Sequence, residues 1–164
     1  PPGRMQQMGG KEAPLVVIDF AHTPDALEKG LSTLRHVADD RNGKLWCIFG
    51  CGGDRDHGKR PEMGEKAESA DVIIVTSDNP RSEDPKKIME EIVSGMTKDP
   101  IQVEDRATAI LTAVKQASKN DVIFVAGKGH EAYQEVKGVK RPFADADHVA
   151  LALASRLTTQ KVEP

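Results

Sequence analysis

Short runs of mostly apolar residues alternate along this chain with longer amphipathic stretches, and this alternation limits the fold more than any other feature. The runs predict strands at 15–19, 45–49, 72–76, 101–103 and 122–126. Because the runs are continuous and rich in Val and Ile, they are typical of strands covered on both faces. Strands separated by helices pair in parallel through right-handed crossovers. The sequence therefore predicts an α/β fold, with a Rossmann-like, doubly wound, mostly parallel sheet of about six strands flanked by helices.

The amphipathic stretches carry apolar residues at helical spacing. In 24–37 these residues recur every three or four positions, and Thr23 is placed as an N-cap before Pro24. Asp84 before Pro85 marks the start of a second helix in the same way. Similar patterns predict helices at 59–69, 85–96, 106–117 and 147–157, and a hairpin of strands 133–136 and 140–143.

The chain is long enough, at 164 residues, for one domain and marginal for two. Residues 1–14 hold three prolines and three glycines, which predicts an interdomain linker or a loose first segment. We expect 15–160 to form the domain. The abrupt start at Pro1 and Pro2 indicates a piece of a longer protein.

Composition argues against several classes of partner. The chain has 23 basic and 26 acidic side chains and a net charge of −3, so it has no surplus positive charge for nucleic acid or an anionic membrane. Its apolar runs are far shorter than the roughly 20 residues that span a bilayer, and it opens with no secretory leader. Cys47 and Cys51 are too close for a relaxed disulfide. We therefore expect a globular protein of the reducing cytoplasm.

Polar segments rich in charge and punctuated by Gly or Pro directly follow four of the predicted strands. Ligands of open α/β sheets bind beyond the carboxyl ends of the strands, because loops and helix N-termini converge there. One such loop would be ordinary turn chemistry, but four in the same position predict a shared site. The segments are FAHTPD, CGGDRDHGKRP, SDNPRSEDP and GKGHEAYQ.

These segments also have purely structural interpretations. Asp19 at a strand end satisfies turn amides in many proteins, and a histidine such as His22 is often a cap or a packing residue. The glycine-rich run 50–55 is either a flexible connection or a place where backbone approaches a ligand. The triplet Gly127-Lys128-Gly129 resembles part of a phosphate loop but lacks its spacing.

Metal binding and cysteine chemistry have little support. Cys47, Cys51 and His57 do not have the spacing of a zinc site. Neither cysteine has an activating partner in the sequence. Four basic residues are expected to lie on solvated helix faces: Lys59, Arg60, Lys86 and Lys87.

Five segments, in the order of the predicted strands, resemble one protein family. They are Gly3-Arg4, DFAHTPDALEKGL at 19–31, FGCGGDRDHGKRPEMG at 49–64, TSDNPRSEDP at 76–85 and VAGKGHEAYQ at 125–134. From Gly3 to about Leu153 the chain resembles the carboxy-terminal domain of the Mur ligase family, in particular of members that add diaminopimelate.

The resemblance implies an ATP-dependent acid:amino-acid ligase of peptidoglycan synthesis. In the family, ATP phosphorylates the D-Glu γ-carboxylate of UDP-MurNAc-L-Ala-D-Glu, and the amine of meso-diaminopimelate attacks the acyl phosphate, which leaves an amide, ADP and phosphate. Two further domains bind the UDP group and carry the phosphate loop, the Mg²⁺ ligands and a modified lysine. This chain is therefore expected to hold no catalytic residue and no metal site, and to be inactive alone.

The resemblance also implies site residues. On the nucleotide side, Asp19 would accept hydrogen bonds from the ATP ribose, Arg4 would reach the phosphates and His22 would lie nearby. Phe20 stands where the family more often has Tyr. On the amino-acid side, the implied residues are Arg55, Asp78, Asn79, Pro80, Arg81, Gly127 and Glu131.

Diaminopimelate explains the second set, because it has an ammonium and a carboxylate at each end and its unreactive end needs groups of both signs. In the family, Arg55 and the segment 78–81 contact the distal carboxylate, to which planar guanidinium groups are suited. Glu131 and the backbone of Gly127 receive the ammonium.

Two alternatives differ in function. The first is the same domain of another ligase of this superfamily, such as a folylpolyglutamate synthetase or the ligase that adds D-Ala-D-Ala, against which DNPR and GKGHE argue. The second is a non-catalytic nucleotide-binding or regulatory domain, which would not recognise an amino acid.

Overall fold

A computed structural model describes residues 4–162 of the chain, with side chains described through residue 157. Residues 1–3, which include Gly3 of the first motif, lie outside the described part. The elements in chain order are β1 (Gln6–Gly9), β2 (Leu15–Asp19), α1 (Pro24–Asp40), β3 (Leu45–Phe49), α2 (Lys59–Ala67), β4 (Val72–Val75), α3 (Pro85–Val93), β5 (Ile101–Gln102), α4 (Arg106–Gln116), β6 (Val122–Ala126), β7 (Tyr133–Val136), β8 (Val139–Pro142) and α5 (Asp145–Val162).

Six strands form one sheet in the order β1-β2-β6-β3-β4-β5. Neighbouring strands run parallel, except that β1 pairs antiparallel with β2. The chain steps from β3 to β5 through adjacent positions and then returns through α4, which inserts β6 between β2 and β3. The predicted α/β class, a mostly parallel, doubly wound sheet flanked by helices, is confirmed.

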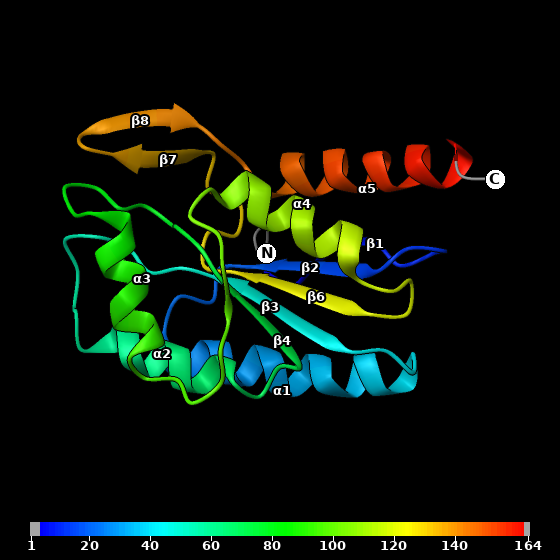
Figure 1. The fold of residues 1–164 in the computed structure, drawn as a ribbon, viewed down its shortest axis with the longest axis horizontal. Coiled ribbons are helices and arrows are strands. Elements are labelled where there is room, and N and C mark those ends of the chain that lie inside the picture. Colours follow the sequence, from blue (N-terminus) through cyan, green and yellow to red (C-terminus); the bar gives the residue numbers. More distant parts are fainter. Residues whose placement is uncertain (1–3, 163–164) are drawn as a thin grey trace.

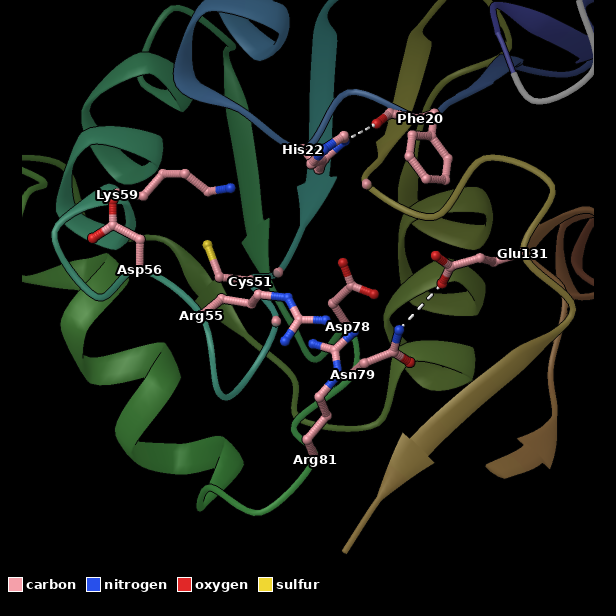
Figure 2. Close-up of a pocket in the computed structure, with 13 residues that line it drawn as sticks. Phe20, His22, Cys51, Arg55, Asp56, Lys59, Asp78, Asn79, Arg81 and Glu131 are labelled. Atoms are coloured by element: carbon pink, nitrogen blue, oxygen red, sulfur yellow. Dashed lines mark hydrogen bonds between the residues drawn. The ribbon is translucent and has the colours of Figure 1, made fainter. Parts of the chain in front are cut away.

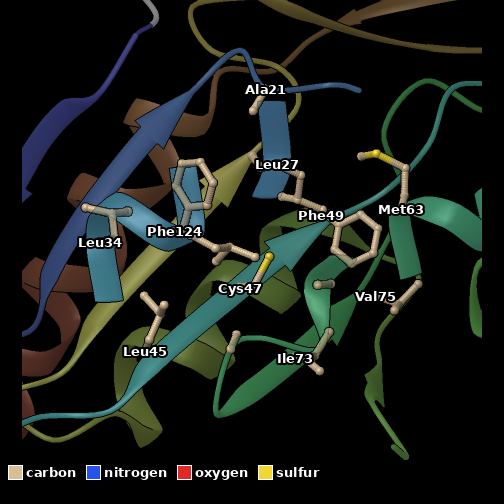
Figure 3. Close-up of a cluster of buried hydrophobic side chains, with 14 of the residues drawn as sticks. Ala21, Leu27, Leu34, Leu45, Cys47, Phe49, Met63, Ile73, Val75 and Phe124 are labelled. Carbon is tan, nitrogen blue, oxygen red and sulfur yellow. The ribbon is translucent and has the colours of Figure 1, made fainter. Parts of the chain in front are cut away.

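Helices cover both faces of the sheet. Figure 1 shows α1 and α2 on one side and α4 and α5 on the other. On the first side, α1, α2 and α3 pack in a cluster that includes Leu27, Phe49 and Phe124 (Figure 3). On the other side, α4 and α5 pack against Trp46 and Ile123. Because successive side chains of a strand point to opposite faces, a sheet covered on both sides buries β3 and β6 along their whole length.

Helix starts follow the predicted caps. The hydroxyl of Thr23 accepts a hydrogen bond from the backbone N–H of Ala26 at 3.2 Å, and the carboxylate of Asp84 accepts one from Lys86 at 2.9 Å. Each cap precedes a proline in the first turn, where its missing N–H is not needed. In the described part of the chain, no helix combines the length and the apolar character that a membrane span requires.

One feature differs from the sequence prediction, and a second adds to it. Residues Gln6–Gly9, inside the segment assigned to a linker, form the edge strand β1, whose mostly exposed side chains leave no apolar pattern to detect. The hairpin of β7 and β8 is present as predicted, but it forms a separate two-stranded sheet. A parallel bridge between Arg81 and Val136 joins this hairpin to the loop after β4.

Candidate functional site

A pocket of about 220 Å³ opens at the carboxyl edge of the sheet. Its walls come from the loops after β2, β3, β4 and β6, and the first residue of α2 completes them, so the predicted convergence of loops is confirmed. The lining residues are Phe20, His22, Gly50, Cys51, Gly52, Arg55, Asp56, Lys59, Asp78, Asn79, Arg81, Gly127 and Glu131 (Figure 2).

Most residues that the sequence assigned to an amino-acid substrate line this pocket. They are Arg55, Asp78, Asn79, Arg81, Gly127 and Glu131. Pro80 belongs to the same loop but is not part of the lining. Of the residues assigned to a nucleotide, His22 lines the pocket, whereas Arg4 and Asp19 do not. The binding roles of all these residues stay predictions.

Arg81 is held firmly in the loop after β4. Its φ of +52° lies in the left-handed region. Its N–H donates to the carbonyl of Glu135 at 3.0 Å, and its carbonyl accepts from the N–H of Lys137 at 2.7 Å. Its guanidinium donates to the carbonyl of Gly53 at 2.9 Å and lies 3.7 Å from the Glu135 carboxylate. Since its side chain is only 18% exposed, Arg81 is not a solvent-facing turn residue, and its five N–H donors exceed these contacts.

Arg55 reaches the same pocket from the loop after β3. Its Nη1 donates to the carbonyl of Asp54 at 2.9 Å, and the Asp54 carboxylate accepts from both the hydroxyl and the backbone of Ser82. The backbone N–H of Gly53 donates to the carbonyl of Asn79 at 2.7 Å. The two arginine-bearing loops therefore form one unit. Figure 2 shows both guanidinium groups directed into the pocket beside Asp78, an arrangement suited to a carboxylate ligand.

Carboxylates gather on one wall of the pocket around Lys128, which no motif in the sequence singled out. The ammonium of Lys128 is fully buried and donates to Asn79 Oδ1 at 3.0 Å, Glu131 Oε1 at 3.1 Å and Asp78 Oδ1 at 3.4 Å. The Asn79 amide also donates to Glu131 Oε1 at 3.2 Å (Figure 2). Because these acceptors enclose the ammonium, Lys128 is not placed as a phosphate-loop lysine would be.

Gly127 lies on this wall at a position where a side chain would be strained and crowded. Its φ of +119° is a conformation that residues with a side chain rarely adopt. A Cβ at this position would lie 3.2 Å from Asp78 Oδ2. The glycine therefore leaves space beside the Asp78 oxygen that does not bind Lys128.

Arg60 corrects the prediction of a solvated helix face. Its side chain is 1% exposed, and it binds both carboxylate oxygens of Glu83, at 2.7 and 3.0 Å. It also donates to Glu91 at 3.3 Å and to the carbonyl of Gly52 at 3.0 Å. The reason is tertiary: α2 begins beside the loop that leads into α3, so this arginine meets carboxylates and not water. Hydrogen bonding from Arg60 lowers the pKa of Glu83 to about 2.

The other three residues of that predicted group, all lysines, differ in exposure. Lys86 and Lys87 are exposed, as predicted. Lys59 is half-buried and lines the pocket, because the first turn of α2 forms part of the wall.

A second buried arginine supports the floor of the site. Arg106, at the start of α4, is fully buried and binds both oxygens of Asp145 at 2.8 Å. It also donates to the carbonyls of Ser77 at 3.1 Å and Ala126 at 3.2 Å. The loops after β4 and β6 therefore leave the sheet from fixed points. Sequence reasoning missed this pair, because an arginine in the first turn of a helix is exposed in most proteins.

Asp19 has a structural role at the end of β2. Its two oxygens accept hydrogen bonds from the backbone N–H groups of Met5 at 2.9 Å and Ala21 at 3.0 Å. These bonds fix the turn that carries Phe20 and His22, whose rings meet edge to face with centroids 5.0 Å apart. A carboxylate oxygen has two lone pairs, so a ribose contact is compatible with these bonds.

The cysteines are not suited to nucleophilic chemistry. Cys47 and Cys51 are free and buried. Burial raises the pKa of Cys51 to about 12 and the pKa of Cys47 far above its usual range. Nucleophilic attack and metal binding both need the thiolate. Across residues 4–162, no group of three or more His, Cys, Asp and Glu side chains is arranged to hold a metal ion.

Comparison with known proteins places these observations in a family. The family described as Mur ligase, glutamate ligase domain, matches residues 3–129. A UDP-N-acetylmuramoyl-L-alanyl-D-glutamate–2,6-diaminopimelate ligase of Janthinobacterium sp. (strain Marseille) is 66% identical over 159 residues, which cover 95% of this chain and 31% of that protein. The ligase of the same name from Ralstonia nicotianae is 60% identical over 158 residues, or 94% and 30% of the two chains. The chain thus spans about a third of the length of these relatives.

Solved structures agree with this result. A UDP-N-acetylmuramoyl-L-alanyl-D-glutamate–2,6-diaminopimelate ligase superposes with a TM-score of 0.86 at 44% identity, over 96% of this chain and 32% of that one. A bifunctional folylpolyglutamate synthase/dihydrofolate synthase with bound Mn, AMPPNP and L-glutamate gives a TM-score of 0.60 at 25% identity, over 77% and 29%. Both identity and superposition favour the first protein.

Proposed function

This chain belongs to the Mur ligase family, and from that membership we propose that it is the amino-acid-binding, carboxy-terminal domain of an ATP-dependent ligase. The ligase adds meso-diaminopimelate to UDP-MurNAc-L-Ala-D-Glu through an acyl phosphate, in peptidoglycan synthesis. Residues 15–160 form this domain together with β1, the strand inside the segment assigned to a linker. The two thirds of the relatives that the chain does not span supply the UDP-binding and ATPase domains.

The observation that carries the proposal is the pairing of charges in the pocket. The guanidinium groups of Arg55 and Arg81 lie beside Asp78, and Glu131 lies farther along the pocket beyond Asp78. The distal end of meso-diaminopimelate has one carboxylate and one ammonium on the same carbon, so it matches the positive and the negative side chains at once. The guanidinium groups bind the carboxylate and Glu131 receives the ammonium. The resemblance grouped Asp78 with the carboxylate-binding segment 78–81, but two carboxylates repel each other, so we assign Asp78 to the ammonium as well. Gly127 gives the ammonium room to approach Asp78.

The loop after β4 organises this recognition. Asn79 holds Glu131 in place through its amide, and Pro80 sets the turn that presents Arg81. With its distal end bound, the amino acid directs its other amine out of the pocket toward the acyl phosphate. Orientation of a bound nucleophile is a large part of the rate gain in such reactions.

Nucleotide binding is shared with the missing domains. His22, Asp19 and Arg4 lie at or near the carboxyl end of β2, where they would approach the ribose and phosphates of ATP. Mg²⁺ is assigned to the other domains, because in the family those domains carry its ligands. Since ATP and a UDP-linked precursor are soluble substrates, we assign the enzyme to the cytoplasm, with no membrane or nucleic-acid partner.

The test is turnover by the full-length protein that contains this chain. We expect amide formation coupled to ADP release with meso-diaminopimelate, and much weaker use of L-lysine, which lacks the distal carboxylate. L-Glutamate with a folate acceptor and D-Ala-D-Ala with its own precursor serve as alternative substrates. Preference for one of these would support another ligase of the superfamily, and ATP binding without amino-acid-dependent turnover would support a regulatory domain.

A further inference from the structure

We propose that Lys128 is a positioning residue that builds the ammonium-binding half of this pocket; this inference rests on the proposed function. It acts through three acceptors, Asp78, Asn79 and Glu131, and these four residues are called the Lys128 cluster. The cluster joins the loop after β4 to the loop after β6.

In the Lys128 cluster, the ammonium of Lys128 is used up by protein acceptors and does not contact a ligand in the pocket. An ammonium group has three N–H donors, and the three acceptors lie 3.0, 3.1 and 3.4 Å from Nζ. The side chain is 0% exposed and is not part of the pocket lining. Asp78, Asn79 and Glu131, by contrast, all line the pocket. Lys128 therefore acts on a ligand through these three neighbours.

Lys128 also sets the direction of the Asn79 amide. Asn79 Oδ1 accepts from Lys128 and from the backbone N–H of Glu135 at 3.0 Å, so the amide nitrogen is turned toward Glu131. Glu131 Oε1 thereby receives two hydrogen bonds, and Asp78 Oδ1 receives one from Lys128. In each carboxylate the other oxygen is the one left to face an incoming ammonium.

The charges of the cluster fit one cation. One lysine and two carboxylates sum to a net charge of −1, which a single substrate ammonium neutralises. Stability alone does not call for this arrangement, because a buried ion pair is often no better than well-packed apolar residues of the same size. A lysine at this position is explained if its task is to hold two carboxylates close together in one orientation.

Two substrate analogues separate the halves of the pocket. L-2-Aminopimelate keeps the distal carboxylate of meso-diaminopimelate and lacks the distal ammonium, whereas L-lysine keeps the ammonium and lacks the carboxylate. In the full-length enzyme, Lys128→Met should raise the KM for meso-diaminopimelate by about 100-fold and leave the KM for ATP within about threefold. It should greatly reduce the preference for meso-diaminopimelate over L-2-aminopimelate and leave the preference over L-lysine nearly unchanged. Lys115→Met, at an exposed lysine in the last turn of α4, is the matched control.

A double variant keeps the test valid if Lys128→Met fails to fold. Lys128→Met/Glu131→Gln removes one charge of each sign, so the cluster keeps its net charge of −1. Because Lys128 acts in part through Glu131, the rise in the KM for meso-diaminopimelate that Lys128→Met causes should be smaller in the Glu131→Gln background than in the wild-type background.

Four outcomes would overturn the proposal. Three concern folded Lys128→Met: an unchanged KM for meso-diaminopimelate, an equal rise in the KM for ATP, or a stronger preference for meso-diaminopimelate over L-2-aminopimelate. The fourth is that the effects of the two substitutions are additive in the double variant. A wild-type enzyme that does not use meso-diaminopimelate overturns the proposed function together with this inference. A wild-type enzyme that does use it, with one of the four results above, overturns the role of Lys128 alone.

Discussion

The guanidinium of Arg60 binds the carboxylate of Glu83 through two parallel hydrogen bonds, Nη2–Oε2 at 2.7 Å and Nη1–Oε1 at 3.0 Å. The pair joins the first turn of α2 to the loop that leads from β4 into α3. Arg60 also binds the carbonyl of Gly52, so the same guanidinium braces the loop that carries Arg55. The positions of Arg55 and Arg81 therefore depend on an ion pair that does not itself line the pocket.

Glu83 should make the stability of this domain depend on pH in acid. Its pKa is about 2 in the folded protein, below its usual value near 4.5. A depressed pKa contributes stability above the unfolded value, and this contribution is lost as pH falls from about 4.5 to about 2. Glu83→Gln should lower the free energy of unfolding by about 1–3 kcal/mol at pH 7. In urea titrations, the difference from wild type should shrink as the pH approaches 2.

Glu90→Gln, at an exposed residue of α3, is the matched control and should change little at either pH. A difference between wild type and Glu83→Gln that is the same at pH 7 and pH 2.5 would show that the Glu83 charge does not stabilise the fold.

Arg81→Ala should remove most of the preference for meso-diaminopimelate over L-lysine. The substitution leaves the distal carboxylate of the substrate desolvated without its partner, a loss on the order of 2–5 kcal/mol. A site that pairs a polar group of its substrate rejects an analogue lacking that group by up to about 10⁴-fold. The measurement is the ratio of kcat/KM for the two amino acids in the full-length enzyme. A ratio equal to that of wild type would remove Arg81 from the carboxylate site.

Gly127→Ala should impair both folding and amino-acid binding. The positive φ strains any residue with a Cβ, at a cost of about 1–3 kcal/mol. The added methyl would also lie 3.2 Å from Asp78 Oδ2, in the space assigned to the ammonium. We expect a raised KM for meso-diaminopimelate together with a lower melting temperature.

Gly138→Ala separates these two effects. Gly138 also has a positive φ, +79°, but no atom lies within 4 Å of the position of its added Cβ. It should lower the melting temperature and leave the KM unchanged. Equal KM values in the two variants would mean that crowding at Asp78 does not matter.

Asp19→Asn should destabilise the turn after β2. Met5 and Ala21 donate to different oxygens of Asp19, and the amide has an NH₂ donor in place of one of them, so one of the two N–H groups loses its acceptor. We expect a loss of about 1–3 kcal/mol in the free energy of unfolding. If Asp19 also binds the ribose, the KM for ATP should rise while the KM for the amino acid changes little. A stable variant with an unchanged KM for ATP would contradict both roles.

The chain alone should have no ligase activity. Its sequence contains no complete G-x-x-x-x-G-K-[ST] loop, and phosphoryl transfer depends chiefly on positioning and electrostatic stabilisation of the phosphates. With ATP, Mg²⁺, the UDP-linked precursor and meso-diaminopimelate, we expect no ADP above background. ADP released in step with the tripeptide product would contradict the proposed division of labour between the domains.

The sequence by itself determined the architecture and the edge of the sheet where the site lies. Continuous apolar runs identified β2, β3 and β6 to the residue, because a strand buried on both faces needs an apolar side chain at nearly every position. The polar segments after four of the strands then marked the pocket, because the carboxyl ends of parallel strands meet at one edge. The edge strand β1 was missed, since a strand with mostly exposed side chains has no such pattern.

Only the tertiary structure decided which charged residues are buried. Arg60, Arg106 and Lys128 look in the sequence like solvated residues, and each is at most 1% exposed. Each is paired with a carboxylate that lies far away in the chain: Glu83 for Arg60, Asp145 for Arg106 and Asp78 for Lys128. Local periodicity reports which face of an element is apolar, but the partner of a buried charge comes from another element. That pairing exists only after the chain has folded.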